Sequence, residues 1–134
     1  MQTKVVFIMG SEADSTHADT IARHLDDLGV QHLRHVASAH KEPRKVLEIV
    51  ESLKDESVVY ITIAGRSNAL SGFVAANSDK PVIACPPFTD KTDMLVNIHS
   101  TLQMPSKTPV LTVIDPGNAA LAALRIISFA AQGV

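Results

Sequence analysis

Three short polar segments carry the side chains that could do chemistry, and each one directly follows a hydrophobic run. They are Met9-Gly10-Ser11-Glu12-Ala13-Asp14, Ser38-Ala39-His40-Lys41 and Ala64-Gly65-Arg66-Ser67-Asn68. If the hydrophobic runs are adjacent strands of a parallel sheet, the three segments lie at one edge, where the ligands of such sheets bind. Hydroxyls, a carboxylate, an imidazole, an ammonium and backbone N–H groups would then line one pocket.

The second segment contains the candidate for proton transfer, His40. A free imidazole titrates near ~6.5, so this side chain can accept and donate a proton at physiological pH. Lys41 beside it supplies a positive charge suited to a phosphate group. The alternative is that His40 only packs or hydrogen-bonds to a loop carbonyl. Its place after a strand and beside a candidate anion site favours the catalytic interpretation.

The first segment has the composition of a turn that binds an anion at the start of a helix. Gly10 permits close backbone approach, Ser11 adds a hydroxyl, and helix N-terminal amides favour negative charge. Asp14 either caps the helix or binds sugar hydroxyls. In the third segment, Gly65 provides flexibility, and Arg66 either binds an anion or forms a salt bridge. The first segment is neither a P-loop nor a G-x-G-x-x-G fingerprint, so nucleoside triphosphate and nicotinamide binding are not indicated.

Hydrophobic runs and helical periodicities alternate along the chain. The expected strands are Val5–Met9, His32–Ala37, Val58–Ala64, Pro81–Cys85 and Pro109–Ile114. The expected helices run from about Thr16 to Gly29, from Pro43 to Leu53, within Ala69–Ala76, over Thr92–Gln103 and over Asn118–Ala131. This alternation predicts a parallel sheet with helices on both faces and right-handed crossovers. We therefore expect one α/β domain over residues 1–134, a three-layer flavodoxin-like fold with five parallel strands in the order 2-1-3-4-5.

Composition and charge narrow the possible partners. The 134 residues are 46% hydrophobic and 19% charged, with a formal net charge of −2. No basic stretch exceeds two residues, so nothing indicates nucleic-acid binding, and the apolar stretches are too short to span a membrane. Cys85 is the single cysteine, which excludes an internal disulfide and predicts a reducing, cytoplasmic setting. No Cys/His spacing of a metal site is present in the sequence.

Two further features concern packing and assembly. Cys85 has no base partner apparent in the sequence, so we interpret it as a small buried side chain rather than a nucleophile. The two prolines that follow it, Pro86 and Pro87, constrain the chain and permit a cis peptide bond there. The last expected helix is apolar almost all round, which predicts that another subunit covers it.

The motifs occur together in an order that resembles one enzyme family. Met9-Gly10-Ser11-x-x-Asp14, Ser38-Ala39-His40-Lys41, Ala64-Gly65-Arg66-Ser67-Asn68, Pro81-Val82-Ile83-x-Cys85-Pro86-Pro87 and Gln103-Met104-Pro105 look like the phosphoribosylaminoimidazole carboxylase family of purine biosynthesis. The resemblance runs from Val5 to about Leu124. Lys41, where the mutase class usually has arginine, and the sequence Arg66-Ser67-Asn68 resemble the class that carboxylates directly with carbon dioxide. Ala13 stands where the family usually has a second serine, so one phosphate or loop contact differs.

The resemblance implies reversible carboxylation of 5-aminoimidazole ribonucleotide at C4 with carbon dioxide, with no cofactor and no metal. It implies His40 as the catalytic proton-transfer group and Ser38 as a residue that orients the base or the ring. The implied substrate contacts are phosphate for Ser11 and Lys41, ribose hydroxyls for Asp14, and carbon dioxide or the nascent carboxylate for Gly65, Ser67 and Asn68. Relatives form octamers, so a homo-oligomer, specifically an octamer, is expected.

Two other functions remain open from the sequence. One is a mutase that converts N5-carboxyaminoimidazole ribonucleotide to 4-carboxyaminoimidazole ribonucleotide. The other is a noncatalytic nucleotide-sensing module, which would keep Ser11 and Asp14 but would not need His40.

Overall fold

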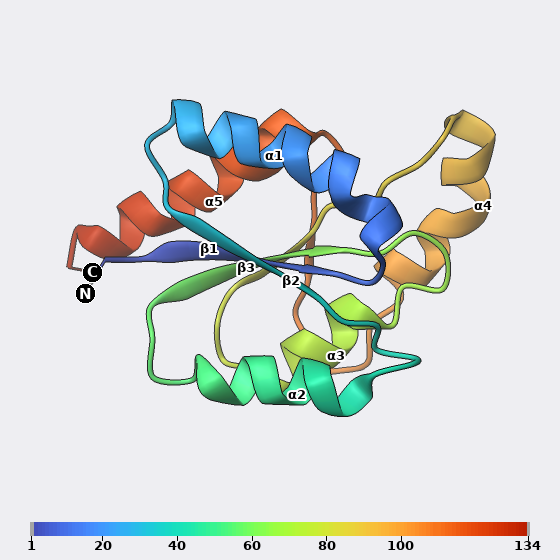
Figure 1. Cartoon of the computed structure of the whole chain (residues 1–134), viewed down its shortest axis with the longest axis horizontal. Helices are drawn as coiled ribbons and strands as arrows, with labels where there is room; N and C mark the ends of the chain where they lie inside the picture. The colour runs from blue at the N-terminus through green and yellow to red at the C-terminus, as the bar shows by residue number, and fades with distance from the viewer. Residues whose placement is uncertain (1, 134) are drawn as a thin grey trace.

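A parallel sheet forms the centre of the structure, a computed structural model that describes residues 2–133 (Figure 1). Its strands are β1 (Lys4–Met9), β2 (His32–Val36), β3 (Val58–Ile63), β4 (Val82–Ala84) and β5 (Leu111–Thr112). The helices are the 3-10 helix η1 (Glu12–Asp14), α1 (Ser15–Asp27), α2 (Pro43–Ser52), α3 (Leu70–Asn77), α4 (Lys91–Leu102) and α5 (Pro116–Ala131). The strands pair in the order β2-β1-β3-β4-β5, and every pair is parallel. The predicted flavodoxin-like fold and strand order are confirmed.

The sheet is covered on both faces, which explains why its central strands are continuous apolar runs. Alternate residues of β1 point to opposite faces. Val5 and Phe7 pack with buried residues of α1 and α5, whereas Val6 and Ile8 pack with those of α2 and α3. Figure 1 shows these two helical layers above and below the sheet. The core therefore consists of two apolar clusters separated by the strands.

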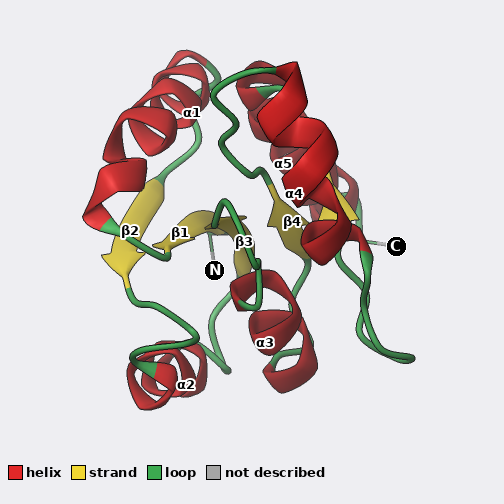
Figure 2. Cartoon of the chain, turned by 90° about the vertical axis from the view of Figure 1, so that its right-hand side faces the viewer, coloured by secondary structure: helices red, strands yellow, loops and turns green. Residues whose placement is uncertain are grey.

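Helix α4 stands at the end of the molecule toward which the strands run (Figure 1). It begins at Asp90, whose carboxylate accepts a hydrogen bond of 2.8 Å from the Asp93 N–H. Thr101 is the only buried residue within Lys91–Leu102. Figure 2 looks onto this end, where the turns after β1, β2 and β3 also lie.

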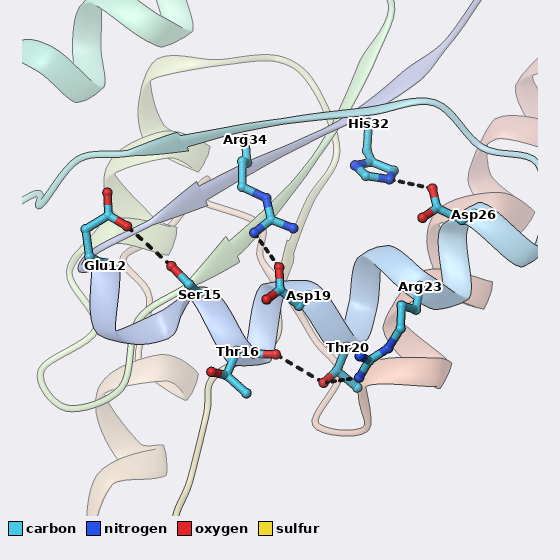
Figure 3. A network of polar contacts seen from close by, with 9 residues as sticks. All are labelled: Glu12, Ser15, Thr16, Asp19, Thr20, Arg23, Asp26, His32 and Arg34. Carbon is cyan, nitrogen blue, oxygen red and sulfur yellow. Dashed lines mark hydrogen bonds and ion pairs between the residues drawn. The ribbon is translucent and has the colours of Figure 1, made fainter.

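The edge strand β2 is joined to α1 by one Arg–Asp ion pair and one His–Asp hydrogen bond (Figure 3). Arg34 Nη1 lies 2.8 Å from Asp19 Oδ1, and His32 Nε2 lies 2.8 Å from Asp26 Oδ1. Exposed pairs of this kind each contribute about 0.2–1 kcal/mol. Their effect here is positional, because α1 follows the first polar segment and β2 leads into the second.

Three local expectations are corrected by the structure. β5 covers only Leu111–Thr112 rather than Pro109–Ile114, because its one neighbour, β4, is itself only three residues long. α5 begins at Pro116, earlier than the expected Asn118. The peptide bonds of the described residues are all trans, so the cis bond that the two prolines permitted after the fourth strand is not formed.

Candidate active site

A cavity of about 280 Å³ lies at the carboxyl ends of β1, β2 and β3. All three polar segments contribute to it, as the rule for ligand sites in open parallel sheets predicts. The lining residues are Gly10, Ser11, Asp14, Ser38, Ala39, His40, Ala64, Gly65, Arg66, Ser67, Ala69 and Leu70. The structure thus brings six of the eight candidate site residues into one cavity.

A larger hollow of about 560 Å³ lies around the turn between α1 and β2, at the opposite end of the sheet. It contains one imidazole, that of His32, which is already paired with Asp26. None of the three polar segments reaches it. The smaller cavity is therefore the candidate active site, because it alone combines the candidate base with hydroxyls and a carboxylate.

The first turn contains two candidate ligand residues, Ser11 and Asp14, of which only Ser11 caps a helix with its side chain. Ser11 Oγ accepts a hydrogen bond of 3.1 Å from the Ala13 N–H and so caps η1. Asp14 precedes α1 but its side chain makes no capping hydrogen bond. Burial raises the pKa of the Asp14 carboxyl, and a hydrogen bond with the Ser11 backbone partly offsets this rise. Of the two alternatives for Asp14, a capping hydrogen bond is not formed, and the carboxylate lines the cavity, where its oxygens can accept hydrogen bonds from hydroxyls.

The second turn fixes the candidate base. Ser38 Oγ accepts a hydrogen bond of 3.1 Å from the Lys41 N–H, and the Ser38 carbonyl accepts one of 2.7 Å from the Glu42 N–H. His40 Nε2 lies 3.0 Å from the Ser67 carbonyl oxygen. A carbonyl can only accept, so Nε2 must carry the proton of this hydrogen bond. In the neutral ring, Nδ1 then has the free lone pair and is the atom that can take a proton.

The third turn holds the carbonyl that His40 contacts. Ser67 has a φ of 50°, in the left-handed region. For a residue with a Cβ this conformation costs about 1–3 kcal/mol, and it persists only where the surroundings fix it. The Ser67 carbonyl also accepts a hydrogen bond of 2.8 Å from the Ala69 N–H. The strained residue thus lines the cavity and presents its backbone oxygen to the imidazole.

Two candidate site residues lie outside the cavity lining. Asn68, expected beside carbon dioxide, is 4% exposed, and its amide is hydrogen-bonded beneath the third turn to Ser71 and Thr101. Because its donors and acceptor are already used there, direct contact with a ligand in the cavity is not its role in this geometry. Lys41, expected at the phosphate, is exposed next to His40.

Arg66 lines both the main cavity and an adjoining hollow of about 320 Å³. Its guanidinium lies 3.9 Å from Asp93 Oδ1, and its side chain is 81% exposed. A long, exposed ion pair of this kind contributes little. The guanidinium therefore stays largely available to an anion at the cavity mouth, although it also has a salt-bridge partner.

Sequence reasoning missed the neighbour of Cys85. His17 Nε2 lies 3.0 Å from the Cys85 carbonyl oxygen and 3.5 Å from its Sγ. Burial, helped by the charge of Asp115, raises the pKa of the Cys85 thiol to about 12, and burial lowers the pKa of His17. Both groups are therefore neutral near pH 7, and the pair is not an activated thiolate–imidazolium. The expectation that Cys85 has no base partner is wrong in geometry, but a buried, unreactive thiol is what the structure shows.

Fold and cavity together define a class of protein. It is an α/β domain of flavodoxin-like topology whose ligand cavity lies at the switch point of the sheet and contains an imidazole with a free nitrogen lone pair. Within residues 2–133, no group of three or more His, Cys, Asp and Glu side chains is placed to hold a metal ion. The helices of the same range are all too short or too polar to cross a membrane.

Comparison with known proteins gives the family. The family model described as AIR carboxylase matches residues 4–134, and the chain belongs to this family. A phosphoribosylaminoimidazole carboxylase of Archaeoglobus fulgidus is 48% identical over 98% of this chain and 72% of its own length. An N5-carboxyaminoimidazole ribonucleotide mutase of Methanocaldococcus jannaschii is 42% identical over 97% of this chain and 82% of its own. The crystal structure of Treponema denticola PurE superposes with a TM-score of 0.88 at 41% identity, covering 96% of this chain and 82% of that one.

Proposed function

We propose that this chain catalyses the reversible carboxylation of 5-aminoimidazole ribonucleotide at C4 with carbon dioxide, a step of purine biosynthesis. The observation that carries this proposal is the position of His40, whose Nε2 is held by the Ser67 carbonyl while Nδ1 stays free at a cavity with a hydroxyl and a carboxylate. Family membership supplies the substrate class. The reaction requires one proton to leave C4, and the cavity contains one candidate base for it, His40.

The chemistry needs little beyond positioning and this one proton transfer. The aminoimidazole ring is an enamine, so the electron pair at C4 forms the new bond to the carbon of carbon dioxide. C4 then carries both a hydrogen and the carboxylate. His40 takes the C4 proton, the ring regains its aromaticity, and the imidazolium later releases the proton to solvent. In the reverse direction, the imidazolium protonates C4 and carbon dioxide leaves.

The remaining candidate residues hold the nucleotide, and their roles are part of the proposal. Ser11 and Lys41 bind the phosphate, Asp14 accepts hydrogen bonds from the ribose hydroxyls, and Ser38 orients the base or the ring. Gly65 and Ser67 form the wall beside carbon dioxide. Binding the nucleotide and carbon dioxide together supplies the rate enhancement that one proton-transfer group cannot.

A second candidate is the mutase reaction, because a relative 42% identical to this chain is named N5-carboxyaminoimidazole ribonucleotide mutase. Lys41 and the sequence Arg66-Ser67-Asn68 favour the direct carboxylase. The deciding assay starts separately from 5-aminoimidazole ribonucleotide, with and without bicarbonate, and from the N5-carboxylated nucleotide. We expect bicarbonate-dependent product from the first substrate. Product from the second substrate alone would establish the mutase, and tight binding without C4 proton exchange would establish a noncatalytic nucleotide-sensing module.

We also propose that the chain acts as a cytoplasmic homo-oligomer, specifically an octamer. Support comes from large apolar side chains that the single chain leaves open: Leu95, Val96 and Leu102 of α4 are 64%, 68% and 58% exposed, and Phe129 of α5 is 61% exposed. The inner face of α5 already packs on α1 through small residues, so only its outer face remains for a partner. A monomeric sedimentation profile at micromolar concentration would contradict this assembly.

A further inference from the structure

A cluster of buried polar side chains lies directly beneath the third turn, outside the cavity. The Asn68 amide nitrogen donates to Ser71 Oγ at 2.8 Å and to Thr101 Oγ1 at 3.1 Å. Asn68 Oδ1 accepts from both the N–H and the hydroxyl of Ser71, each at 3.1 Å. The Ser71 N–H can only donate, so it fixes which end of the amide is oxygen. Thr62 Oγ1, 2.7 Å from Ser71 Oγ, ties the cluster to β3.

The same cluster controls one peptide plane that reaches the cavity. The peptide group between Ser67 and Asn68 is trans, so its C=O and N–H point in opposite directions. Its C=O accepts from His40 Nε2 at 3.0 Å, and its N–H donates to Ser100 Oγ of α4 at 2.8 Å. The orientation of this plane therefore decides whether a carbonyl oxygen faces the imidazole.

That orientation is not one the backbone adopts freely, because Ser67 has a φ of 50°. A left-handed residue that is not glycine needs its neighbours to hold it. Besides the Ala69 N–H, which donates to the Ser67 carbonyl at 2.8 Å, two anchors involve side chains: the N–H of Asn68 on the Ser100 hydroxyl, and the side chain of Asn68 in the buried cluster. Without them the turn could relax, and the carbonyl would leave Nε2.

We propose that Asn68 and Ser100 are positioning residues that set the proton arrangement of His40. By holding the Ser67 carbonyl against Nε2, they keep the proton of the neutral ring on Nε2 and the lone pair on Nδ1. The expected effect on catalysis rests on the proposed function, because that function makes Nδ1 the atom that accepts the C4 proton. The claim about the tautomer itself is independent of any activity.

The test measures the tautomer and the turnover separately. Long-range proton–nitrogen NMR spectra of protein labelled with ¹⁵N-histidine report which ring nitrogen is protonated, and loss of one signal in His40→Asn assigns His40. We expect the Nε2–H form in the wild type, and a mixture with the Nδ1–H form in Ser100→Ala and Asn68→Ala. We expect kcat to fall 5- to 50-fold in both variants, because the ring loses its fixed orientation as well as part of the Nε2–H form, with KM for the nucleotide changed less than twofold.

Two further variants make the result specific. Ser100→Thr keeps a hydroxyl acceptor and should restore kcat to within threefold of the wild type. Ser52→Ala removes a hydroxyl that bonds a backbone carbonyl on α2, away from the site, and should change neither readout. If Asn68→Ala does not fold, Ser100→Ala decides, because Ser100 is only partly buried.

Two outcomes would overturn the proposal. One is a pure Nε2–H form of His40 in a folded Ser100→Ala or Asn68→Ala protein, even if turnover is lower, because the loss would then have another cause. The other is an unchanged kcat in variants whose tautomer has shifted. If the wild type showed no carboxylation at all, the proposed function would fail, while the spectra would still decide whether the turn fixes the tautomer.

Discussion

Replacing His40 with asparagine separates the proposed chemistry from binding and from folding. Asparagine keeps a polar amide of moderate size at the position, but it cannot accept the C4 proton. His40 is exposed, and its side chain makes a hydrogen bond to the Ser67 carbonyl. We therefore expect the variant to fold and to bind the nucleotide, but to lose ring carboxylation.

The two expected free-energy changes differ enough to be told apart. Loss of one neutral hydrogen bond costs about 0.5–1.5 kcal/mol, well below the total stability of about 5–15 kcal/mol of an ordinary domain. Loss of one general base lowers the rate about 10²–10⁴-fold. At about 1.36 kcal/mol for each factor of ten, that loss amounts to about 2.7–5.4 kcal/mol of transition-state stabilisation. A partly unfolded sample cannot account for a deficit of this size.

The assay measures kcat and KM with saturating bicarbonate, calorimetric nucleotide affinity, and exchange of the C4 proton of 5-aminoimidazole ribonucleotide with deuterium. We expect kcat and exchange to fall together while the affinity stays within about threefold of the wild type. His24→Asn, the same change at an exposed position of α1, serves as the matched control. Turnover of His40→Asn above a tenth of the wild-type value would remove His40 as the base.

Three other predictions follow from burial and exposure. Because the native Asp14 carboxyl has a raised pKa, the folded state binds its proton more tightly than the unfolded chain, and wild-type stability falls as pH rises through the native pKa. Thermal unfolding from pH 3 to 8 should therefore show that Asp14→Asn has the higher melting temperature at pH 7 and that the difference from the wild type vanishes in acid. The variant should also bind the nucleotide more weakly. A lower melting temperature of Asp14→Asn at pH 7 would contradict this reasoning. Cys85 is buried with a pKa of about 12, so mass spectrometry should find no iodoacetamide adduct at pH 8 until the protein is unfolded, and labelling at the rate of a free thiol would refute that. Val96→Asp places a charge on the open face of α4, and sedimentation should show a smaller species than the wild type, whereas an unchanged mass would exclude this face from the subunit contact.

The fold was predictable because the central strands are buried on both faces. Runs such as Val5–Met9 and Val58–Ile63 are mostly apolar and buried at every position, and they alternate with segments of helical period. The bounds of the edge strand β5 were harder to predict. This strand pairs over only two residues, and so short a strand has no recognisable alternation of polar and apolar residues. The start of α5 had a signal that was overlooked, since Asp115 caps the helix and Pro116 occupies its first position.

The candidate site was predictable to the extent that topology alone decides it. Knowing that three turns share one edge of the sheet was enough to bring Ser11, Asp14 and His40 to one cavity. The direction of a side chain within a turn follows no period, so the burial of Asn68 could not be foreseen. The contact of His17 with Cys85 is likewise tertiary, because it joins residues 68 positions apart.

Part of the chemistry of this site belongs to the backbone, which limits what its sequence can reveal. The group that orients His40 is a carbonyl, and any residue at position 67 would provide one. What the sequence must specify instead is the direction of that carbonyl. In this protein Asn68 sets that direction: its amide bonds Ser71 of α3 and Thr101 of α4, and Ser71 is bonded in turn to Thr62 of β3. An asparagine next to a catalytic turn can therefore matter for catalysis without touching the substrate, and the proton on the imidazole is where its effect should be measured.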